Sequence, residues 1–229
     1  RVITPRIGKP VEINALWFNA LQAMVGFAKR LNKPDKAYAA KAEVVRKGFE
    51  RFWNNDAGYC FDVIDGPAGN DAKLRPNQLF AVSLPNTLLD DERQRKIVQV
   101  CGETLLTSMG LRSLAPQDPD YLGRYGGPQA RRDGAYHQGT VWAWLIGPYI
   151  SAFLKVSKDP RAAMGRLQPL ADHLMSSGVG TISEIFDGDV PTWPRGCIAQ
   201  AWSVGEALRA LELVVNTMAE LDGRTDGGR

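Results

Sequence analysis

Two segments of the chain combine aromatic and polar residues at the head of an apolar stretch. The first, 135–150, reads AYHQGTVWAWLIGPYI and carries His137. The second, 183–211, carries Glu184 in a loop and then Trp202. Imidazole and carboxylate groups bind polar atoms, whereas aromatic faces pack on apolar surfaces. This combination predicts a pocket for a ligand that has polar edges and apolar faces, such as a sugar.

Glu184 is the candidate for acid–base chemistry. It lies between the apolar residues Ile182 and Phe186, and apolar surroundings shift the proton affinity of a carboxyl group. Hydrolysis of a glycosidic bond needs carboxyl groups tuned in this way. The alternative is structural, with Glu184 or Asp187 capping a turn.

Other polar candidates stand where further apolar helices are predicted to begin. Arg75, followed by Asn77, either pairs with a carboxylate of a substrate site or braces a loop. Glu12 suits the positive N-terminal end of a helix, which is the simpler account of it. His137 or Thr140 can likewise satisfy free backbone groups in a first helical turn.

The helices that must position these residues are of two kinds. Apolar periodicity predicts about seven helices, near 11–31, 35–54, 75–84, 90–107, 137–156, 160–176 and 196–221. The first, third, fifth and seventh are apolar on nearly every side, whereas the others have one apolar stripe. This alternation predicts an all-α fold with inner and outer helices, an α/α toroid. About seven helices make roughly half of such a ring, so we expect a partial barrel with an exposed apolar edge.

The segments that lead into the inner helices are long and rich in Gly, Pro and aromatic residues. They span 55–74, 110–136 and 177–195. Loops of this length in a compact domain are usually functional, and we expect them to gather at one rim of the ring. The run Tyr59–Asp65 is the one short strand that the sequence suggests.

Composition excludes several classes of protein. The net charge of +3 is small and dispersed, which argues against a nucleic-acid partner. No segment reaches the roughly 18 apolar residues of a membrane span. Three widely spaced cysteines, Cys60, Cys101 and Cys197, favour a reducing, cytoplasmic location. With two histidines, of which His173 is predicted to be structural or solvent-facing, we expect no metal and no cofactor.

Several strings resemble, in order along the chain, the C-terminal amylo-α-1,6-glucosidase domain of glycogen debranching enzymes. They are GKPVEINALWFNAL, LRPNQLFAVSLP, GLRSLAP, YHQGTVWAWLIGPYI and EIFDG followed by GCIAQAWSVGE. The resemblance implies an (α/α)6 barrel of the glucoamylase-like kind. It also implies inverting hydrolysis of α-1,6-linked glucosyl stubs, with a branched α-glucan such as glycogen or its limit dextrin as the partner.

The resemblance also assigns residues. Glu184 matches the position of the general base. The probable substrate-binding residues are Glu12, Asn14, Trp17, Arg75, Asn77, His137, Gln138, Gln200 and Trp202. The family's general acid is an Asp in a Trp-Met-Asp motif upstream of a Thr-Pro-Arg element, and here Thr4, Pro5 and Arg6 open the chain. We therefore expect residues 1–229 to be the C-terminal portion of a single catalytic domain, without the general acid.

Two alternatives stay open. One keeps the class and changes the substrate, giving a related glucoamylase or trehalase-type glucosidase. The other is a non-catalytic helical fragment that binds glucan. Helical-repeat proteins show self-similar sequence at a fixed period, and its absence here counts against a solenoid.

Overall fold

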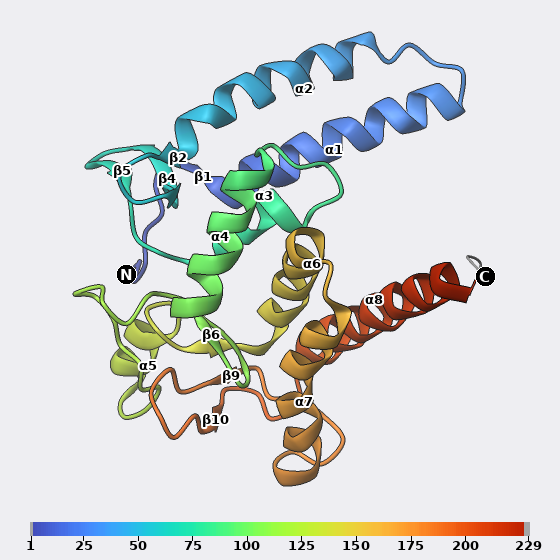
Figure 1. Cartoon of the computed structure of the whole chain (residues 1–229). Helices are drawn as coiled ribbons and strands as arrows, with labels where there is room; N and C mark the ends of the chain where they lie inside the picture. Colours follow the sequence, from blue (N-terminus) through green and yellow to red (C-terminus); the bar gives the residue numbers. More distant parts are fainter. Residues whose placement is uncertain (1, 227–229) are drawn as a thin grey trace.

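The computed structural model describes residues 2–226, with side chains described as far as residue 223 (Figure 1). Within residues 2–226 the chain forms eight α-helices joined by 3-10 turns and short strands. The helices are α1 (Val11–Arg30), α2 (Lys36–Phe49), α3 (Phe80–Ser83), α4 (Asp91–Thr104), α5 (Gln129–Ala135), α6 (Ile146–Ser157), α7 (Pro160–Ser176) and α8 (Ala201–Asp226). The 3-10 turns are η1 (Glu50–Phe52), η2 (Pro76–Leu79) and η3 (Ala143–Leu145).

The helices are arranged in an arc with an inner and an outer layer. Along the inner layer α1 packs against α3, α3 against α6, and α6 against α8. In the outer layer α2 packs on α1, α4 on α6, and α7 on both α6 and α8 (Figure 1). Helices touched from several sides must be apolar on several sides, which is the pattern that predicted the two layers.

Local sequence sets where the outer helices begin. The side chain of Asp90 accepts a hydrogen bond of 2.8 Å from the backbone N–H of Arg93 at the start of α4. Asp159 accepts one of 2.9 Å from Ala162 at the start of α7, where Pro160 occupies the first helical position. Both helices therefore begin where the capping residues predict.

The rim segments contain short strands that the sequence did not predict. The strands are β1 (Lys9–Pro10), β2 (Trp53–Asn54), β3 (Tyr59–Cys60), β4 (Val63–Gly66), β5 (Gly69–Asp71), β6 (Leu106–Thr107), β7 (Gly110–Arg112), β8 (Val141–Trp142), β9 (Ile185–Phe186) and β10 (Pro194–Arg195). They form a five-stranded sheet in the order β10-β9-β8-β7-β6, a three-stranded sheet β1-β4-β5 and the pair β2-β3. The single strand expected at 59–65 is two strands, interrupted at Phe61 and Asp62.

The prediction of a fifth helix at 137–156 is wrong for the first half of that segment. α6 begins at Ile146, and a turn, β8 and η3 precede it. β8 is paired on both sides, because Trp142 lies opposite Leu111 of β7 and Ile185 of β9. Hydrogen bonds to two neighbouring strands satisfy the backbone groups that a helix would satisfy internally. His137 therefore lies in a turn and does not open a helix.

Two smaller boundaries also differ from the prediction. α5 occupies part of the segment 110–136, which composition presents as a loop. α8 begins at Ala201, later than the predicted start near Gly196. Gly196 has a φ of +66°, a conformation that ends regular helix and suits glycine.

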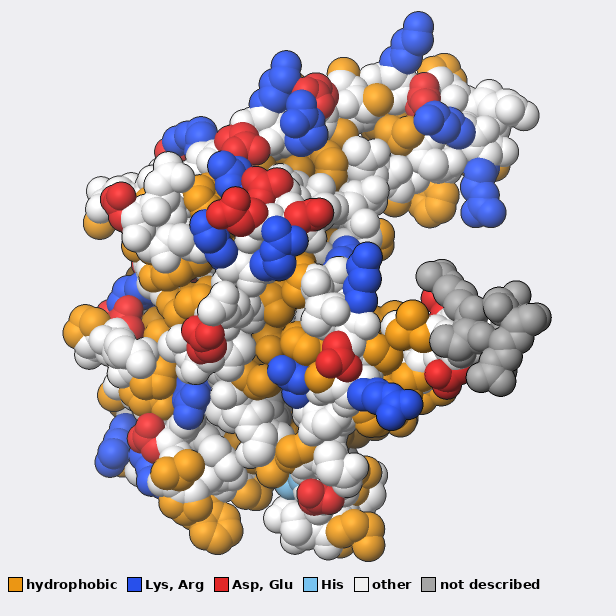
Figure 2. All heavy atoms as spheres, in the orientation of Figure 1, with side chains coloured by type: hydrophobic (Ala, Val, Ile, Leu, Met, Phe, Trp, Pro, Cys, Tyr) orange, Lys and Arg blue, Asp and Glu red, His pale blue; other side chains and the backbone are white. Residues whose placement is uncertain are grey.

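Both ends of the arc expose apolar side chains. Phe27 on α1 is 54% exposed and Trp202 on α8 is 56% exposed. Figure 2 shows apolar side chains on the facing flanks of these helices, on either side of a hollow. The expected exposed apolar edge is therefore present along α1 and α8.

Two general properties complete the description. Along residues 2–226, none of the helices combines the length and the hydropathy needed to cross a bilayer. Cys60, Cys101 and Cys197 are free thiols, and the first two are buried. Burial raises the pKa of Cys60 to about 12, so this thiol stays protonated.

Candidate active site

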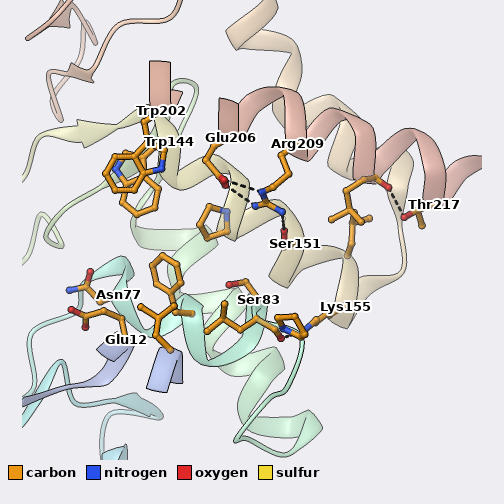
Figure 3. Close-up of a pocket in the computed structure, with 17 residues that line it drawn as sticks. Glu12, Asn77, Ser83, Trp144, Ser151, Lys155, Trp202, Glu206, Arg209 and Thr217 are labelled. Atoms are coloured by element: carbon orange, nitrogen blue, oxygen red, sulfur yellow. Dashed lines mark hydrogen bonds and ion pairs between the residues drawn. The ribbon is translucent and has the colours of Figure 1, made fainter. Parts of the chain in front are cut away.

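A pocket of about 430 Å³ opens where the inner helices begin. It is lined by Thr4, Arg6, Arg75, Pro76, Asn77, Ser113, His137, Trp142, Trp144, Leu145 and Trp202. A cavity of about 990 Å³ continues from it along α1, α3, α6 and α8, and Asn77, Trp144 and Trp202 line both (Figure 3). Residues distant in sequence thus meet in one cup at the rim.

A cluster of opposite charges forms one wall of the pocket. Arg6 makes two hydrogen bonds to Glu12, at 2.5 and 2.8 Å, and its Nε donates to Asp62 at 2.7 Å. Asn77 donates to the other oxygen of Asp62 at 2.8 Å. Burial raises the pKa of Asp62, and Arg6 is the main opposing influence. For Arg6, burial lowers the pKa, but its bonds to the two acids outweigh burial and raise it.

Arg75 braces a loop, which was one of its two predicted roles. Its Nη1 donates to the backbone oxygens of Ser113 at 3.0 Å and His137 at 2.6 Å, and its Nη2 donates to the side chain of Gln138. Burial lowers the pKa of Arg75. The forked guanidinium thereby fixes the turn that carries His137, while Arg75 itself also lines the pocket.

Two stacked aromatic pairs form the apolar wall. The His137 ring lies parallel to Trp142, with centroids 5.1 Å apart and an interplanar angle of 4°. Trp144 and Trp202 stack at 4.2 Å, at one end of the larger cavity (Figure 3). His137 is exposed at the pocket, yet loss of water around its ring, with Arg75 nearby, lowers its pKa. The imidazole is therefore neutral near pH 7.

Glu184 lies at this same end of the molecule. The hydroxyl of Tyr136 donates to its Oε1, and the backbone N–H of Cys197 donates to its Oε2 at 3.0 Å. Glu184 immediately precedes β9, the neighbour of the strand that carries Trp142. The backbone N–H of Gln200 donates to Ile182 at 3.0 Å, which joins this segment to the start of α8. Glu184 is half-buried, and its partner Tyr136 packs against His137 and Trp142, but Glu184 itself is not among the described residues that line the two cavities.

Buried polar groups hold the segment around Glu184. Asp187 is fully buried, accepts a 2.8 Å bond from the N–H of Tyr125, and pairs with Arg195 at 2.9 Å. His173 is buried beneath Ser183, and its Nε2 lies 3.4 Å from both the backbone N and the Oγ of Ser183. His173 is therefore structural, and Asp187 ties two rim loops together.

Only some of the remaining predicted binding residues line the two cavities. Glu12 lines the larger cavity. Asn14 donates to the backbone oxygen of Pro10 at 2.8 Å, and Trp17 is 51% exposed on the flank of α1, so neither lines the two cavities. Gln138 accepts a hydrogen bond from Arg75 at the pocket, and Gln200 is half-buried immediately before α8; neither lines the two cavities. Their contacts with a substrate stay predictions.

Sequence reasoning missed three residues that shape the site. Arg6 lines the pocket and bonds to the buried Asp62 behind it, and Tyr136 bonds to Glu184. The signal for Asp62 is an acid inside the apolar run CFDVI, where an unpaired charge would be costly. Among the described residues, no group of three or more His, Cys, Asp or Glu side chains is arranged to hold a metal ion.

Solved structures of other proteins share this fold. A GH63 mannosylglycerate hydrolase from Thermus thermophilus, in complex with Tris and D-glycerate, matches with a TM-score of 0.65 and 18% identity, over 88% of this chain and 45% of that one. Neutral trehalase from Saccharomyces cerevisiae matches with a TM-score of 0.65 and 14% identity, over 89% and 37% of the two chains. These likenesses confirm the predicted α/α toroid.

The sequence matches are more specific. Glycogen debranching enzyme from Saccharomyces cerevisiae is 27% identical over 196 residues, which cover 66% of this chain and 12% of that protein. The chain thus spans only a small part of that relative and less than half of the solved structures. The model of the family described as amylo-alpha-1,6-glucosidase matches residues 1–209. With nearly its whole length matched, this chain belongs to the amylo-α-1,6-glucosidase family.

Proposed function

We propose that this chain supplies the general-base side of an inverting glycoside hydrolase that removes α-1,6-linked glucosyl stubs from branched α-glucan. The observation that carries the proposal is the carboxylate of Glu184, held by Tyr136, whose ring packs against those of His137 and Trp142 at the pocket. The match to a glycogen debranching enzyme supports this substrate class over other glycosides. Aromatic faces and neutral polar groups in the pocket suit an uncharged sugar ring.

The reaction uses two carboxyl groups, one of which accepts a proton while the other donates one. A water oxygen forms the new bond to the anomeric carbon while its proton passes to Glu184. The bond between that carbon and the glycosidic oxygen breaks, and this oxygen takes a proton from a second carboxylic acid, about 6.5–9.5 Å from the first. The proposal places that acid on another part of the toroid. Neither a metal nor a cofactor takes part.

The domain proposal follows from the exposed edges. Residues 1–229 form the C-terminal portion of one toroid, whose remaining helices pack on the apolar flanks of α1 and α8. The share of the solved relatives that the chain covers, 45% and 37%, supports this division. The free thiols support a reducing, cytoplasmic location.

A substrate panel tests the proposal. Glucose release is measured with glycogen limit dextrin, linear maltose and trehalose, with a chelator present, for the chain alone and for the chain extended by the remaining part of the proposed toroid. We expect the extended protein to act on limit dextrin and the isolated chain to be inactive. Preferential cleavage of maltose or trehalose would indicate a related glucosidase instead. Glucan binding with no cleavage by the extended protein would contradict the enzyme altogether.

A further inference from the structure

We propose that Tyr136 is a positioning residue that, together with the peptide N–H of Cys197, holds the carboxylate of Glu184 in one orientation for accepting a proton from water. The inference rests on the proposed function, because it assigns the base role to Glu184. It adds a residue outside the predicted site and gives the carboxylate a defined support.

The support reaches both oxygens of the carboxylate. Tyr136 donates through its hydroxyl to Oε1, and Cys197 donates through its backbone to Oε2 at 3.0 Å. A carboxylate has about four acceptor positions, so two bonds fix its plane and leave positions for a water molecule. Both donors, a phenol and a peptide N–H, are neutral groups.

The backbone also closes around Glu184. Gly196 has a φ of +66°, and a Cβ at this position would lie 2.3 Å from Oε2 of Glu184. A glycine is therefore needed for the chain to turn here and present the next N–H, that of Cys197, to the carboxylate. The residue that approaches Glu184 most closely, Gly196, thus directly precedes Cys197, which supplies the second donor.

Hydrogen bonds and ring contacts restrain Tyr136 itself. Its backbone oxygen accepts from Thr140 Oγ1 at 2.6 Å and from Trp142 Nε1 at 3.0 Å. Its ring meets those of His137 and Trp142 edge-on, each with centroids 4.8 Å apart. Because ring and backbone are both restrained, the hydroxyl stays aimed at Glu184. The same aromatic cluster lines the pocket through His137 and Trp142.

The protonation state of Tyr136 suits a permanent donor. Burial and then the hydrogen bond to Glu184 raise the pKa of Tyr136, so the phenol keeps its proton across the neutral range. The phenol therefore remains a hydrogen-bond donor to Glu184 and keeps the carboxylate oriented.

A first test needs no catalysis and uses the 229-residue chain. The chain is labelled with 13C at tyrosine Cζ, and the NMR shift of Tyr136, assigned with Tyr136→Phe, is followed through the carboxyl range, about pH 3 to 7. We expect the shift to follow a titration that disappears in Glu184→Gln and persists in Tyr125→Phe. Tyr125 is the matched control, since its ring lies 5.8 Å from that of Tyr136. A Tyr136 shift that ignores pH, or titrates unchanged in Glu184→Gln, would overturn the inference.

A second test uses glucose release by the active, extended protein. Tyr136→Phe is expected to lower kcat about ten- to hundredfold and to change KM less than about twofold. Tyr125→Phe should retain kcat. If Tyr136→Phe does not fold, Gly196→Ala, which displaces the carboxylate and keeps the hydroxyl, should show the same loss of kcat. Unchanged kcat in the folded variant tested refutes the positioning role.

The two tests also separate this inference from the proposed function. Suppose that the NMR shift of Tyr136 follows the titration of Glu184 but the extended protein cleaves no glucan. That result contradicts the glycosidase and leaves the contact between Tyr136 and Glu184 intact. Glucose release that keeps its kcat in Tyr136→Phe contradicts the inference and leaves the glycosidase intact.

Discussion

Asp62 and Glu184 are carboxylates at the same rim, and their surroundings differ mainly in charge. Asp62 is 2% exposed, bonded to Arg6 and Asn77, with Arg75 3.8 Å away. Glu184 is half-buried, and among the described residues it forms no salt bridge. Its two protein donors are a phenol and a peptide N–H. Asp62 is thus tied into a charged network with arginine, whereas Glu184 is held by neutral donors.

The largest expected effect separates the two carboxylates by activity. Glu184→Gln removes the proton acceptor and should lower glucose release about a thousandfold, since general-base catalysis is worth about 10²–10⁴. The unfolding midpoint should change little, because glutamine keeps the shape of the side chain. Glu43→Gln, an exposed glutamate on α2, is the control for loss of a carboxylate. Full activity in Glu184→Gln would remove Glu184 from the base role.

Asp62→Asn should act on stability. The change leaves Arg6 and Arg75 with less compensation in a buried setting, and we expect a loss of about 2–3 kcal/mol in the free energy of unfolding. Urea denaturation measures it. The surface carboxylate Asp65, paired with Lys9 and Arg51, provides the control, and Asp65→Asn should cost clearly less. Equal losses in both variants would mean that burial does not distinguish the carboxylates.

Arg75→Lys should give an intermediate effect. Lysine cannot reproduce the fork that holds Ser113, His137 and Gln138, so we expect a loss of about 1–2 kcal/mol in unfolding free energy. KM for limit dextrin should rise as the turn loosens. Arg46→Lys on the outer surface of α2 serves as the comparison. Unchanged stability and KM would show that the fork is dispensable.

The smallest expected effect is on the pH dependence of stability, through His173, which packs beneath the segment that carries Glu184. Burial lowers the pKa of His173 below its ordinary value of 6.5, so the unfolded chain binds this proton more readily. The stability that neutral His173 contributes is complete above pH 6.5 and is lost as the pH falls through the lowered pKa of the folded state. His173→Gln, which retains an acceptor for Ser183, should flatten thermal stability across this range. An unaltered slope would show that His173 titrates normally.

The sequence predicted the helical layers more reliably than the rim. Helices α1, α4 and α7 have long periodic patterns and clear ends, such as Asp90 and Asp159. The rim strands are two to four residues long, too short for an alternating pattern to appear. Segment 137–145 is apolar enough for a helix, and only pairing of β8 with β7 and β9 makes it extended.

The candidate site was predicted in the same uneven way. Glu184, His137 and Trp202 were singled out because their types suit sugar chemistry, and the structure brings them to one end of the molecule. Asp62 and Tyr136 were not, since nothing adjacent in sequence reveals their partners. Tyr136 and Glu184 are 48 positions apart.

The chain's own residues determined the layered helices, the family and the types of side chain available at the rim, because periodicity and motif are local properties. Only the tertiary structure decided which carboxylate pairs with arginine and which is held by neutral donors. That outcome depends on donors brought from distant segments, Arg6 to Asp62 and Tyr136 to Glu184. Charge and hydrogen bonding act through space, so the electrostatic role of an acid follows from the folded arrangement around it.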